Sequence, residues 1–501
     1  MFKLNISALG VCAVLFTTSP RVHGEHIVIM HTNDTHSQID PAADGKGGVA
    51  RRKVLIDSIR AAEPHTLLID AGDAVQGSNY FTLYGGEVEA LMLNELGYEY
   101  AILGNHEFDN GMESLGKYIS SVNAPYIATN YIVTGTPLEG KLTRYRIVPI
   151  AGKRIGLIGI NIDPKGMIAD EKSVGVVYQD PFKAANATAW HLKNNEGVDY
   201  VVAITHIGYE VNPLPDDIKL VENSEDIDII IGGHSHTVVE PGSEKSHRRN
   251  AAGKDVLIAQ TGSTGANLGV ITIDTDNNTF SSQLIPVDSR LDGRVDDSIL
   301  AKLEPYRHGV DSLKSIVVGK SRIEAPRGDE RILNFVTDFI EWEGKRLNGN
   351  KAVDLGIANR GGIRTPMNSG PITRGGIMEM LPFDNRVVVL ELTGQQLLDV
   401  FDTNVKAPRV GFSRPVAVVV ENGHVTRATL NGVAVDPEKT YVVSTVDYLA
   451  NGGDYMTPLT LGKVLNSSDR IMNLDVIDYI GSLKGKTVKE NKTRRFSAAD
   501  N

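Results

Sequence analysis

Short apolar runs alternate with longer amphipathic stretches from Ile27 to about Val287. A short run of branched apolar residues between turn-forming residues is typical of a buried strand. The longer stretches, such as Gly48–Ala62 and Gly86–Leu96, predict helices. Strands separated by helices favour an α/β fold in which helices cover the sheets. The expected strands are Ile27–Met30, Thr66–Ile69, Tyr100–Leu103, Ile155–Ile160, Tyr200–Thr205 and Ile227–Ile231.

A second pattern begins after a polar stretch at Asp288–Ser315, within which Asp297–Asp311 predicts a connecting helix. Beyond it, Gly-rich loops separate another set of elements, and 501 residues are enough for two or three domains. We expect a first domain over residues 25–290, a linker helix over 291–315 and a second domain over 316–501. The expected elements of the second domain are the helix Ile332–Leu347 and the strands Val387–Leu392, Val416–Val420 and Tyr441–Thr445.

The first 24 residues have the pattern of a cleavable secretory signal. Lys3 gives a short positive region, and the apolar stretch Ile6–Phe16 is too short to span a bilayer as a mature helix. Gly24 places a small residue just before a possible cleavage site at Glu25. We therefore expect a periplasmic or secreted protein, with an uncleaved anchor or a ragged N-terminus as the alternative.

The overall composition, 41% hydrophobic and 23% charged, is that of a soluble globular protein. A net charge of −11 without a Lys/Arg-rich run argues against binding of a nucleic-acid polymer. The single cysteine, Cys12, lies in the expected signal, so the mature chain would have no disulfide. The polar C-terminus Lys484–Asn501 predicts no membrane anchor after signal cleavage. The oligomeric state stays open.

Five polar segments of the first domain each follow an expected strand, and in open α/β folds ligands bind at that end of the strands. Their imidazole, carboxylate and amide groups suit borderline divalent metals. In Asp34-x-His36 and His234-x-His236, residues two apart in an extended chain point the same way, so each pair is expected to reach one centre. Asp73 has two carboxylate oxygens and is suited to bridge two metals. The segments are Asn33–His36, Asp70–Asp73, Gly104–Asp109, Thr205–His206 and Gly232–His236.

The ordered set DxH, GDxxxG, GNHEFD, H and GHSH resembles the calcineurin-like metallophosphoesterases. The full-length arrangement resembles the 5'-nucleotidase family, which includes UDP-sugar hydrolases and 2',3'-cyclic phosphodiesterases. The resemblance implies a four-layer α/β metallophosphoesterase sandwich, a second α+β substrate-binding domain and two divalent metal ions, such as Zn or Mn. The implied ligands are Asp34, His36, Asp73 and His236 for one metal, and Asp73, Asn105, His206 and His234 for the other.

The same resemblance assigns His106 to the transition state and Asp109 to orienting it. Two metals would neutralise a phosphate and lower the pKa of a bound water, so that a metal-bound hydroxide attacks phosphorus. An imidazole fixed by a carboxylate can stabilise the new charge or protonate the leaving group. The implied reaction is release of phosphate from a nucleoside 5'-monophosphate.

Three segments of the second domain resemble the family's substrate-binding segments. Arg364 would grip phosphate through a two-pronged hydrogen bond. A base stacked between Phe383 and Tyr448 would gain roughly 1–3 kcal/mol per face, and Asp454 would accept hydrogen bonds from ribose hydroxyls. The implied substrate-binding residues are Asn359, Gly361, Gly362, Arg364, Phe383, Tyr448 and Asp454.

Some positions depart from the family pattern. Arg360 replaces a glycine, and Tyr455-Met456 follow Asp454 where many members have glycine and an aromatic residue. The upstream phosphate-binding arginine is Arg327, Arg331 or absent. UDP-sugars, 2',3'-cyclic nucleotides, dinucleotides and sulfur oxyanions stay open as substrates, as does a non-catalytic secreted nucleotide-binding protein. If the base pocket and the metals lie on different domains, catalysis is expected to need closure of the cleft between them.

Overall fold

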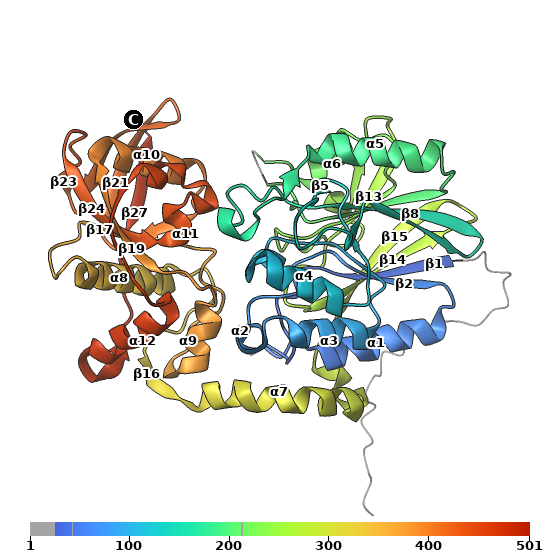
Figure 1. Ribbon diagram of the computed structural model, residues 1–501, viewed down its shortest axis with the longest axis horizontal. Coiled ribbons are helices and arrows are strands. Elements are labelled where there is room, and N and C mark those ends of the chain that lie inside the picture. The colour runs from blue at the N-terminus through green and yellow to red at the C-terminus, as the bar shows by residue number, and fades with distance from the viewer. Residues whose placement is uncertain (1–25, 43, 212–213, 501) are drawn as a thin grey trace, which may run out of the picture.

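The computed structural model describes residues 26–42, 44–211 and 214–500 (Figure 1). It has an α/β domain and an α+β domain, with helix α7 (Asp297–Ser315) running along one edge of both. The expected secretory signal, residues 1–24, lies outside the described residues. Among the helices that are described, none is both long and apolar enough to cross a membrane.

Two stacked sheets form the first domain. The strand order is β15-β14-β1-β2-β3-β4-β6 in one sheet and β12-β13-β11-β10-β8-β7 in the other. The first sheet consists of β1 (His26–Thr32), β2 (Thr66–Asp70), β3 (Tyr100–Ala101), β4 (Tyr126–Ile127), β6 (Leu142–Thr143), β14 (Asn267–Asp274) and β15 (Thr279–Pro286). The second consists of β7 (Tyr145–Ile150), β8 (Lys153–Ile160), β10 (Tyr200–Thr205), β11 (Ile229–Ile231), β12 (His247–Arg249) and β13 (Asp255–Ala259).

Helices cover the outer face of each sheet, which gives four layers (Figure 1). The helices α1 (Val49–Ala62), α3 (Glu87–Leu96) and α4 (Gly111–Ser121) pack on the first sheet, and α5 (Pro181–Asn194) and α6 (Asp217–Glu222) pack on the second. Between the sheets lies a core of fully buried branched residues, among them Ile29, Ile69, Leu157, Ile204 and Ile229. The expected four-layer α/β sandwich is confirmed.

All six strands expected in the first domain are present, and the pairs β1–β2, β2–β3, β8–β10 and β10–β11 are parallel. Strand β3 ends at Ala101, two residues before the expected end at Leu103. The carbonyl of Leu103 accepts a hydrogen bond of 2.6 Å from the Asn161 side chain. The Gly104 N–H donates to Glu107. Because side chains take these backbone groups, no strand partner is needed there.

The second domain is built on a five-stranded sheet of order β20-β17-β24-β19-β25, a four-stranded sheet of order β23-β22-β21-β27 and a three-stranded sheet of order β18-β16-β26. The strands are β16 (Val317–Ser321), β17 (Leu355–Asn359), β18 (Gly370–Thr373), β19 (Val387–Thr393), β20 (Val410–Phe412), β21 (Val416–Glu421), β22 (His424–Leu430), β23 (Val433–Ala434), β24 (Thr440–Val446), β25 (Lys463–Ser467), β26 (Thr487–Val488) and β27 (Phe496–Asp500). The helices are α8 (Glu330–Leu347), α9 (Arg374–Met380), α10 (Gly394–Lys406), α11 (Asp447–Ala450) and α12 (Met472–Ser482).

The apolar face of α8 supplies much of the second core. Ile332, Val336, Phe339 and Ile340 are buried at helical spacing against the five-stranded sheet. The side chain of Asp329 caps the helix by accepting a hydrogen bond from the Arg331 N–H. This core carries the loops that face the first domain.

Helix α7 is the linker expected from the sequence, and it extends to Ser315 rather than Asp311. Its buried residues Ile299, Leu303 and Val310 pack on the first domain. Near its end, Lys314 forms an ion pair of 3.1 Å with Glu379 of α9. The linker therefore contacts both domains.

Candidate metal centre and adjoining pocket

The five polar segments converge where the carboxyl ends of the two sheets meet. Asp34, Asp73 and Asn105 follow β1, β2 and β3 of the first sheet, whereas His206 and His234 follow β10 and β11 of the second. All of these side chains are buried or nearly so. This placement fits the expectation that the site lies just beyond the strand ends.

The Asp34–His36 and His234–His236 pairs were expected to converge because alternate residues of an extended chain point the same way. That explanation is wrong, because these residues are not extended. Their φ angles lie in the left-handed region, which non-glycine residues rarely adopt and which is typical of functional sites. Loop turns, and not strand alternation, bring the side chains together. The φ values are 49° at Asp34, 47° at His36, 55° at Asp73, 75° at His234 and 55° at His236.

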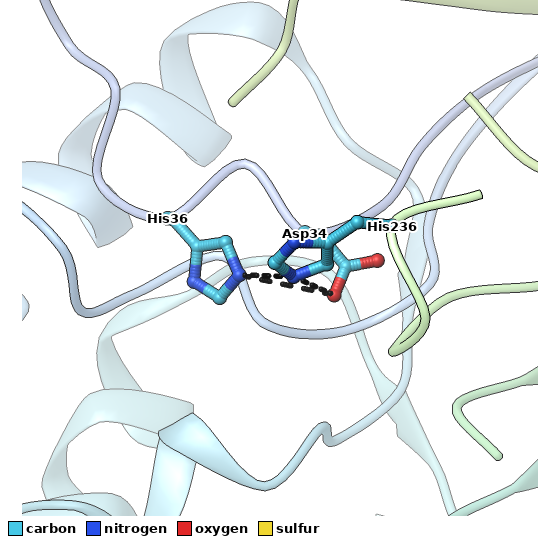
Figure 2. A group of neighbouring side chains, drawn as sticks. All are labelled: Asp34, His36 and His236. Carbon is cyan, nitrogen blue, oxygen red and sulfur yellow. Dashed lines mark hydrogen bonds and ion pairs between the residues drawn. The ribbon is translucent and has the colours of Figure 1, made fainter. Parts of the chain in front are cut away.

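One cluster consists of Asp34, His36 and His236 (Figure 2). The Nε2 atom of His236 lies 2.9 Å from His36 Nε2 and 3.4 Å from Asp34 Oδ1. The other ring nitrogen of His36, Nδ1, is 3.2 Å from the Gln76 carbonyl oxygen, a contact that favours the proton on Nδ1 and makes Nε2 an acceptor. Two imidazole nitrogens and a carboxylate oxygen facing one point are suited to hold a cation.

A second cluster surrounds Asp73 and His206. The Nδ1–H of His206 donates to the Ala71 carbonyl at 2.7 Å, while its Nε2 lies 3.2 Å from Asp73 Oδ2. That Nε2 atom is buried and makes no hydrogen bond with any described residue. Nearby, His234 Nδ1 is 3.0 Å from Asn105 Oδ1. Imidazole nitrogens, a carboxylate oxygen and an amide oxygen that lie this close together are a donor set that also fits a metal.

The electrostatics of the centre reflect its buried carboxylates. Burial lowers the pKa of His206, but Asp73 and Asp34 more than offset this and raise it to about 10. Burial and the charge of His206 lower the pKa of His234 to about 3. Burial and Arg364 hold the pKa of His36 well below its ordinary value. The buried carboxylates thus favour positive charge around them, in the place that metal cations would take.

His106 stands beside the two clusters. Its Nδ1 lies 2.9 Å from Asp109 Oδ2, and its Nε2 lies 4.0 Å from Asp73 Oδ2. Burial lowers the pKa of His106, and Asp109 and Asp73 more than offset this, so that the net pKa is raised. The carbonyl of Asp109 accepts a hydrogen bond of 2.6 Å from Lys172. The imidazole is held in one orientation and kept ready to carry a proton.

Glu107 also supports the candidate metal centre, although the sequence does not predict a role for it. Its carboxylate accepts backbone hydrogen bonds from Asp73 (3.1 Å), Ala74 (2.8 Å) and Gly104 (2.6 Å). Burial and the charge of Asp73 raise its pKa to about 8. The side chain ties two loops of the centre together from behind. Its position in the GNHEFD segment was the only available signal, since nothing in the spacing shows which way it points.

A cavity of about 680 Å³ opens from this centre and is lined by both domains. His106, Asp109 and His234 lie on the first-domain side, and most of the expected substrate-binding residues lie on the other. Gly362 is the exception: it packs on Asn359, where an added Cβ would lie 2.7 Å from Oδ1. The expected residues that line the cavity are Asn359, Gly361, Arg364, Phe383, Tyr448 and Asp454.

Side chains of the second domain reach the candidate metal centre directly. Arg364 Nη2 lies 3.0 Å from His36 Nε2. Phe383 stacks on His106, with ring centroids 5.5 Å apart and planes inclined by 22°. Asp454 Oδ2 accepts a hydrogen bond of 3.0 Å from Asn359. The structure is therefore a closed arrangement, in which both domains contribute to one site.

The two candidate phosphate-binding arginines are placed differently. Arg327 lines the cavity, and burial together with neighbouring Arg364 lowers its pKa to about 10. Arg331 instead pairs with Asp329 at 2.8 Å and Glu490 at 2.6 Å. Two unneutralised guanidinium groups side by side favour an anion between them.

A loop of the first domain closes over the cavity. The Gly166 carbonyl accepts a hydrogen bond of 3.0 Å from the Asp454 N–H. Gly166 has a φ of +80°, and an added Cβ would lie 2.9 Å from the Tyr455 ring. The ring of Tyr455 is also covered by Arg409, whose guanidinium carbon is 5.3 Å from the ring centroid. Glycine at position 166 allows this close contact between the domains.

Two family models match the chain. The calcineurin-like phosphoesterase model matches residues 27–238, and the model of the 5'-nucleotidase C-terminal domain matches residues 314–460. The chain belongs to the 5'-nucleotidase family. Members of this family are metal-dependent phosphoester hydrolases with a dimetal centre, so the chain is an enzyme of that type. The expected second α+β domain is likewise confirmed.

Proteins similar to this chain align with most of its length. The 5'-nucleotidase of Bos taurus is 29% identical over 80% of this chain and 75% of its own length. The trifunctional nucleotide phosphoesterase protein of Bacillus subtilis is 27% identical over 85% of this chain, which spans 32% of that protein. The solved 5'-nucleotidase precursor from Thermus thermophilus is 27% identical, with a TM-score of 0.85, over 94% of this chain and 99% of that one.

Proposed function

We propose that this chain hydrolyses nucleoside 5'-monophosphates to a nucleoside and inorganic phosphate. The observation that carries the proposal is one cavity whose walls combine the candidate metal centre, the guanidinium groups of Arg327 and Arg364, and the rings of Phe383 and Tyr448. A nucleoside 5'-monophosphate has matching parts: a dianion, a ribose with two hydroxyls and a flat base. The similarity to 5'-nucleotidases supports the same reaction.

The residues proposed to hold two divalent metals are those expected from the sequence. Bound metals supply positive charge that neutralises the phosphate and lowers the pKa of water. The buried Nε2 of His206, 3.2 Å from Asp73 Oδ2, and the facing nitrogens of His36 and His236 support this assignment. The proposed ligand sets are Asp34, His36, Asp73 and His236 for one metal, and Asp73, Asn105, His206 and His234 for the other.

His106 is proposed to protonate the leaving 5'-oxygen. Asp109 accepts the Nδ1–H, so the second proton of the imidazolium is on Nε2, which faces the centre. The neighbouring carboxylates that raise the pKa of His106 keep that proton available. Once the proton has moved to the leaving oxygen, Asp109 stabilises the neutral ring in its orientation.

The second domain is proposed to bind the rest of the substrate. Arg364 and Arg327 would bind phosphate oxygens by charge-assisted hydrogen bonds. Phe383 and Tyr448 would stack on the base, and Asp454, oriented by Asn359, would accept hydrogen bonds from the ribose.

We also propose that residues 1–24 direct export, so that the enzyme acts in the periplasm or as a secreted protein. Mass spectrometry of the purified protein determines whether it begins at Glu25.

The proposed folded units are residues 25–290, the linker helix 291–315 and residues 316–501. The course of α7 and the start of β16 support this division.

The test of the proposed function is a substrate panel. Purified protein with added Mn²⁺ is assayed for phosphate release from adenosine, inosine and uridine 5'-monophosphates, with glucose 6-phosphate as a substrate without a base. We expect kcat/KM to be at least about a hundredfold higher for the nucleotides, because stacking and ribose contacts add roughly 3 kcal/mol. Equal rates for the sugar phosphate would contradict the nucleotide assignment.

The same panel includes His106→Ala, with His308→Ala as the matched control. His308 is an exposed histidine on α7 and lies outside the cavity. We expect kcat of His106→Ala to fall by about 10²–10⁴-fold while both metals stay bound, since general acid catalysis contributes that much. Full activity of His106→Ala would remove this residue from the mechanism.

A further inference from the structure

The segment Gln260–Gly262, which follows β13, is bonded to two of the loops that carry candidate metal ligands, although it supplies no candidate ligand itself. Asp34 comes from the loop after β1, and His236 comes from the loop after β11. These loops are far apart in the sequence, yet Asp34 Oδ1 and His236 Nε2 lie 3.4 Å apart (Figure 2). A group that joins the two loops would control how the ligands meet.

The side chain of Gln260 is fully buried and spans the loop that carries the two candidate histidine ligands after β11. Its Nε2–H donates to the Gly233 carbonyl at 3.0 Å. Its Oε1 accepts hydrogen bonds from the Thr237 N–H at 2.6 Å and from the Ser235 hydroxyl at 3.0 Å. One amide therefore holds the loop before, between and after those histidines.

An amide is suited to this position because it has donors and acceptors on one group. A carboxylate at position 260 would place an acceptor against the Gly233 carbonyl, and an apolar side chain would leave the Thr237 N–H without this acceptor. The loop needs such support, because His234 and His236 have φ angles of 75° and 55° in the left-handed region. The hydrogen bonds of Gln260 thus stabilise a turn that the backbone disfavours.

The next two residues are bonded to the loop after β1 through the fully buried Asn33. Asn33 Oδ1 accepts from the Thr261 N–H at 2.8 Å and from the Thr261 hydroxyl at 2.7 Å. Asn33 Nδ2 donates to the Gly262 carbonyl at 2.8 Å and to Asp34 Oδ2 at 2.6 Å. The His234 N–H also donates to Asp34 Oδ2, at 2.9 Å. The segment therefore joins the loop of Asp34 to the loop of the two histidines.

We infer that Gln260 is a positioning residue for the metal centre, which acts through the loop that carries His234 and His236. The inference deepens the proposed function and rests on it, because these histidines are the proposed ligands of its two metals. Gln260 does not line the cavity of about 680 Å³, so its effect on the reaction is exerted through the imidazoles. Groups that orient metal ligands typically contribute about tenfold to a hundredfold to metal affinity.

Asn250 provides a matched control at the other end of β13. It is also a buried amide with hydrogen bonds to a loop. Its Nδ2 donates to the Glu225 carbonyl at 3.0 Å, and its Oδ1 accepts from the N–H groups of Ala252 at 3.0 Å and Lys254 at 2.9 Å. That loop carries no candidate ligand. Gln260→Met and Asn250→Leu each remove the amide and keep a side chain of similar size.

The test is a calorimetric titration of the chelator-treated full chain with Mn²⁺. We expect Gln260→Met to raise the Kd of at least one Mn²⁺ by about tenfold to a hundredfold, and Asn250→Leu to change neither Kd by more than about twofold. Both variants should lower the Tm of the metal-free chain, because each leaves backbone groups without their partners. Saturating Mn²⁺ should restore kcat of Gln260→Met for adenosine 5'-monophosphate to within about threefold of the unsubstituted value, since metal occupancy is what the variant loses.

The inference is overturned if Gln260→Met binds Mn²⁺ as tightly as the unsubstituted chain, or if Asn250→Leu loses as much affinity. An unsubstituted chain that binds no Mn²⁺ would overturn it as well. Because Mn²⁺ binding is measured without substrate, the outcome is separate from that of the proposed function. The expected pattern of Mn²⁺ binding in a chain that releases no phosphate from adenosine 5'-monophosphate would support the inference and contradict the proposed function.

Hydrogen exchange of the unsubstituted chain tests the same contact if Gln260→Met does not fold. In the metal-free protein, the Thr237 N–H that Gln260 accepts should exchange at least about a hundredfold more slowly than an unstructured amide. Adding Mn²⁺ should slow it by less than about a further tenfold. Protection that appears only after Mn²⁺ is added would show that metals, and not Gln260, order the loop.

Discussion

Left-handed backbone at the candidate ligands is held in place by hydrogen bonds between loops. The Asp34 N–H donates to the Gly72 carbonyl at 2.9 Å, and the His36 N–H donates to the Asp73 carbonyl at 3.0 Å. The Asp34 carbonyl accepts from Thr264 at 2.7 Å. Each left-handed residue costs about 1–2 kcal/mol, which neighbouring loops must offset. These hydrogen bonds therefore hold the candidate ligand residues in position.

Replacing Arg327 and Arg331 in turn tests which of the two binds phosphate. Arg327→Ala should raise KM for adenosine 5'-monophosphate by about tenfold to a hundredfold, because a charge-assisted hydrogen bond contributes roughly 1.5–3 kcal/mol. Steady-state kinetics of phosphate release measures this. The cause would be loss of phosphate binding, so kcat should change less than KM.

Arg331→Ala is the matched control, since Arg331 lies four positions further along and pairs with Asp329 and Glu490 outside the cavity. Its KM should stay within about twofold of the unsubstituted value. The assignment of Arg327 fails if the two variants behave alike, or if Arg331→Ala has the larger effect.

Candidate site residues can be predicted from the sequence where short spacing carries the information. Asp34, His106 and His236 lie in compact motifs, and the structure brings them together. Arg327 and Glu107 could not be assigned, because their roles depend on which way a side chain leaves its loop. Asp454 and Asn359 were expected to face a ligand, and the structure adds that they bond to each other at 3.0 Å.

Strands and helices follow the apolar pattern closely, and loops do not. The strand Tyr200–Thr205 was predicted with its observed bounds, because every residue in it is buried between two covered faces. Strand β3 is shorter than predicted, since side chains of Asn161 and Glu107 take its last backbone groups. The loop that carries Gly166 had no pattern to indicate that it reaches the second domain.

That loop gives a prediction about Gly166→Ala. The added Cβ would press on the Tyr455 ring and weaken the hydrogen bond from Asp454 to the Gly166 carbonyl. We expect KM for adenosine 5'-monophosphate to rise about fivefold to tenfold, corresponding to roughly 1–1.4 kcal/mol. Substrate-dependence curves of phosphate release measure the change.

Gly140→Ala is the control that distinguishes the loss of this contact from the effect of backbone strain. Gly140 has a φ of +76°, close to that of Gly166, but an added Cβ there would meet nothing within 4 Å. Both variants should lose thermal stability through backbone strain, and only Gly166→Ala should change KM. A shared change in KM, or none in either variant, would show that the loop contact does not position Asp454.

Both domains contribute to the candidate site only because one domain docks closely on the other. Arg364 reaches His36 and Phe383 reaches His106 across the interface. The sequence predicted two domains and a linker helix, but these contacts depend on the docking of one domain on the other. Helix α7 packs on the first domain and contacts α9 of the second, where Lys314 pairs with Glu379.

The central claim is that the convergent ligands between Asp34 and His236 hold metals on which phosphate release depends. The most direct measurement is phosphate release from adenosine 5'-monophosphate by protein treated with a chelator, before and after Mn²⁺ is added back. We expect activity to fall at least about a hundredfold on chelation and to return as two Mn²⁺ bind per chain, because two metals supply the charge stabilisation. Unchanged activity after complete metal removal would contradict the claim.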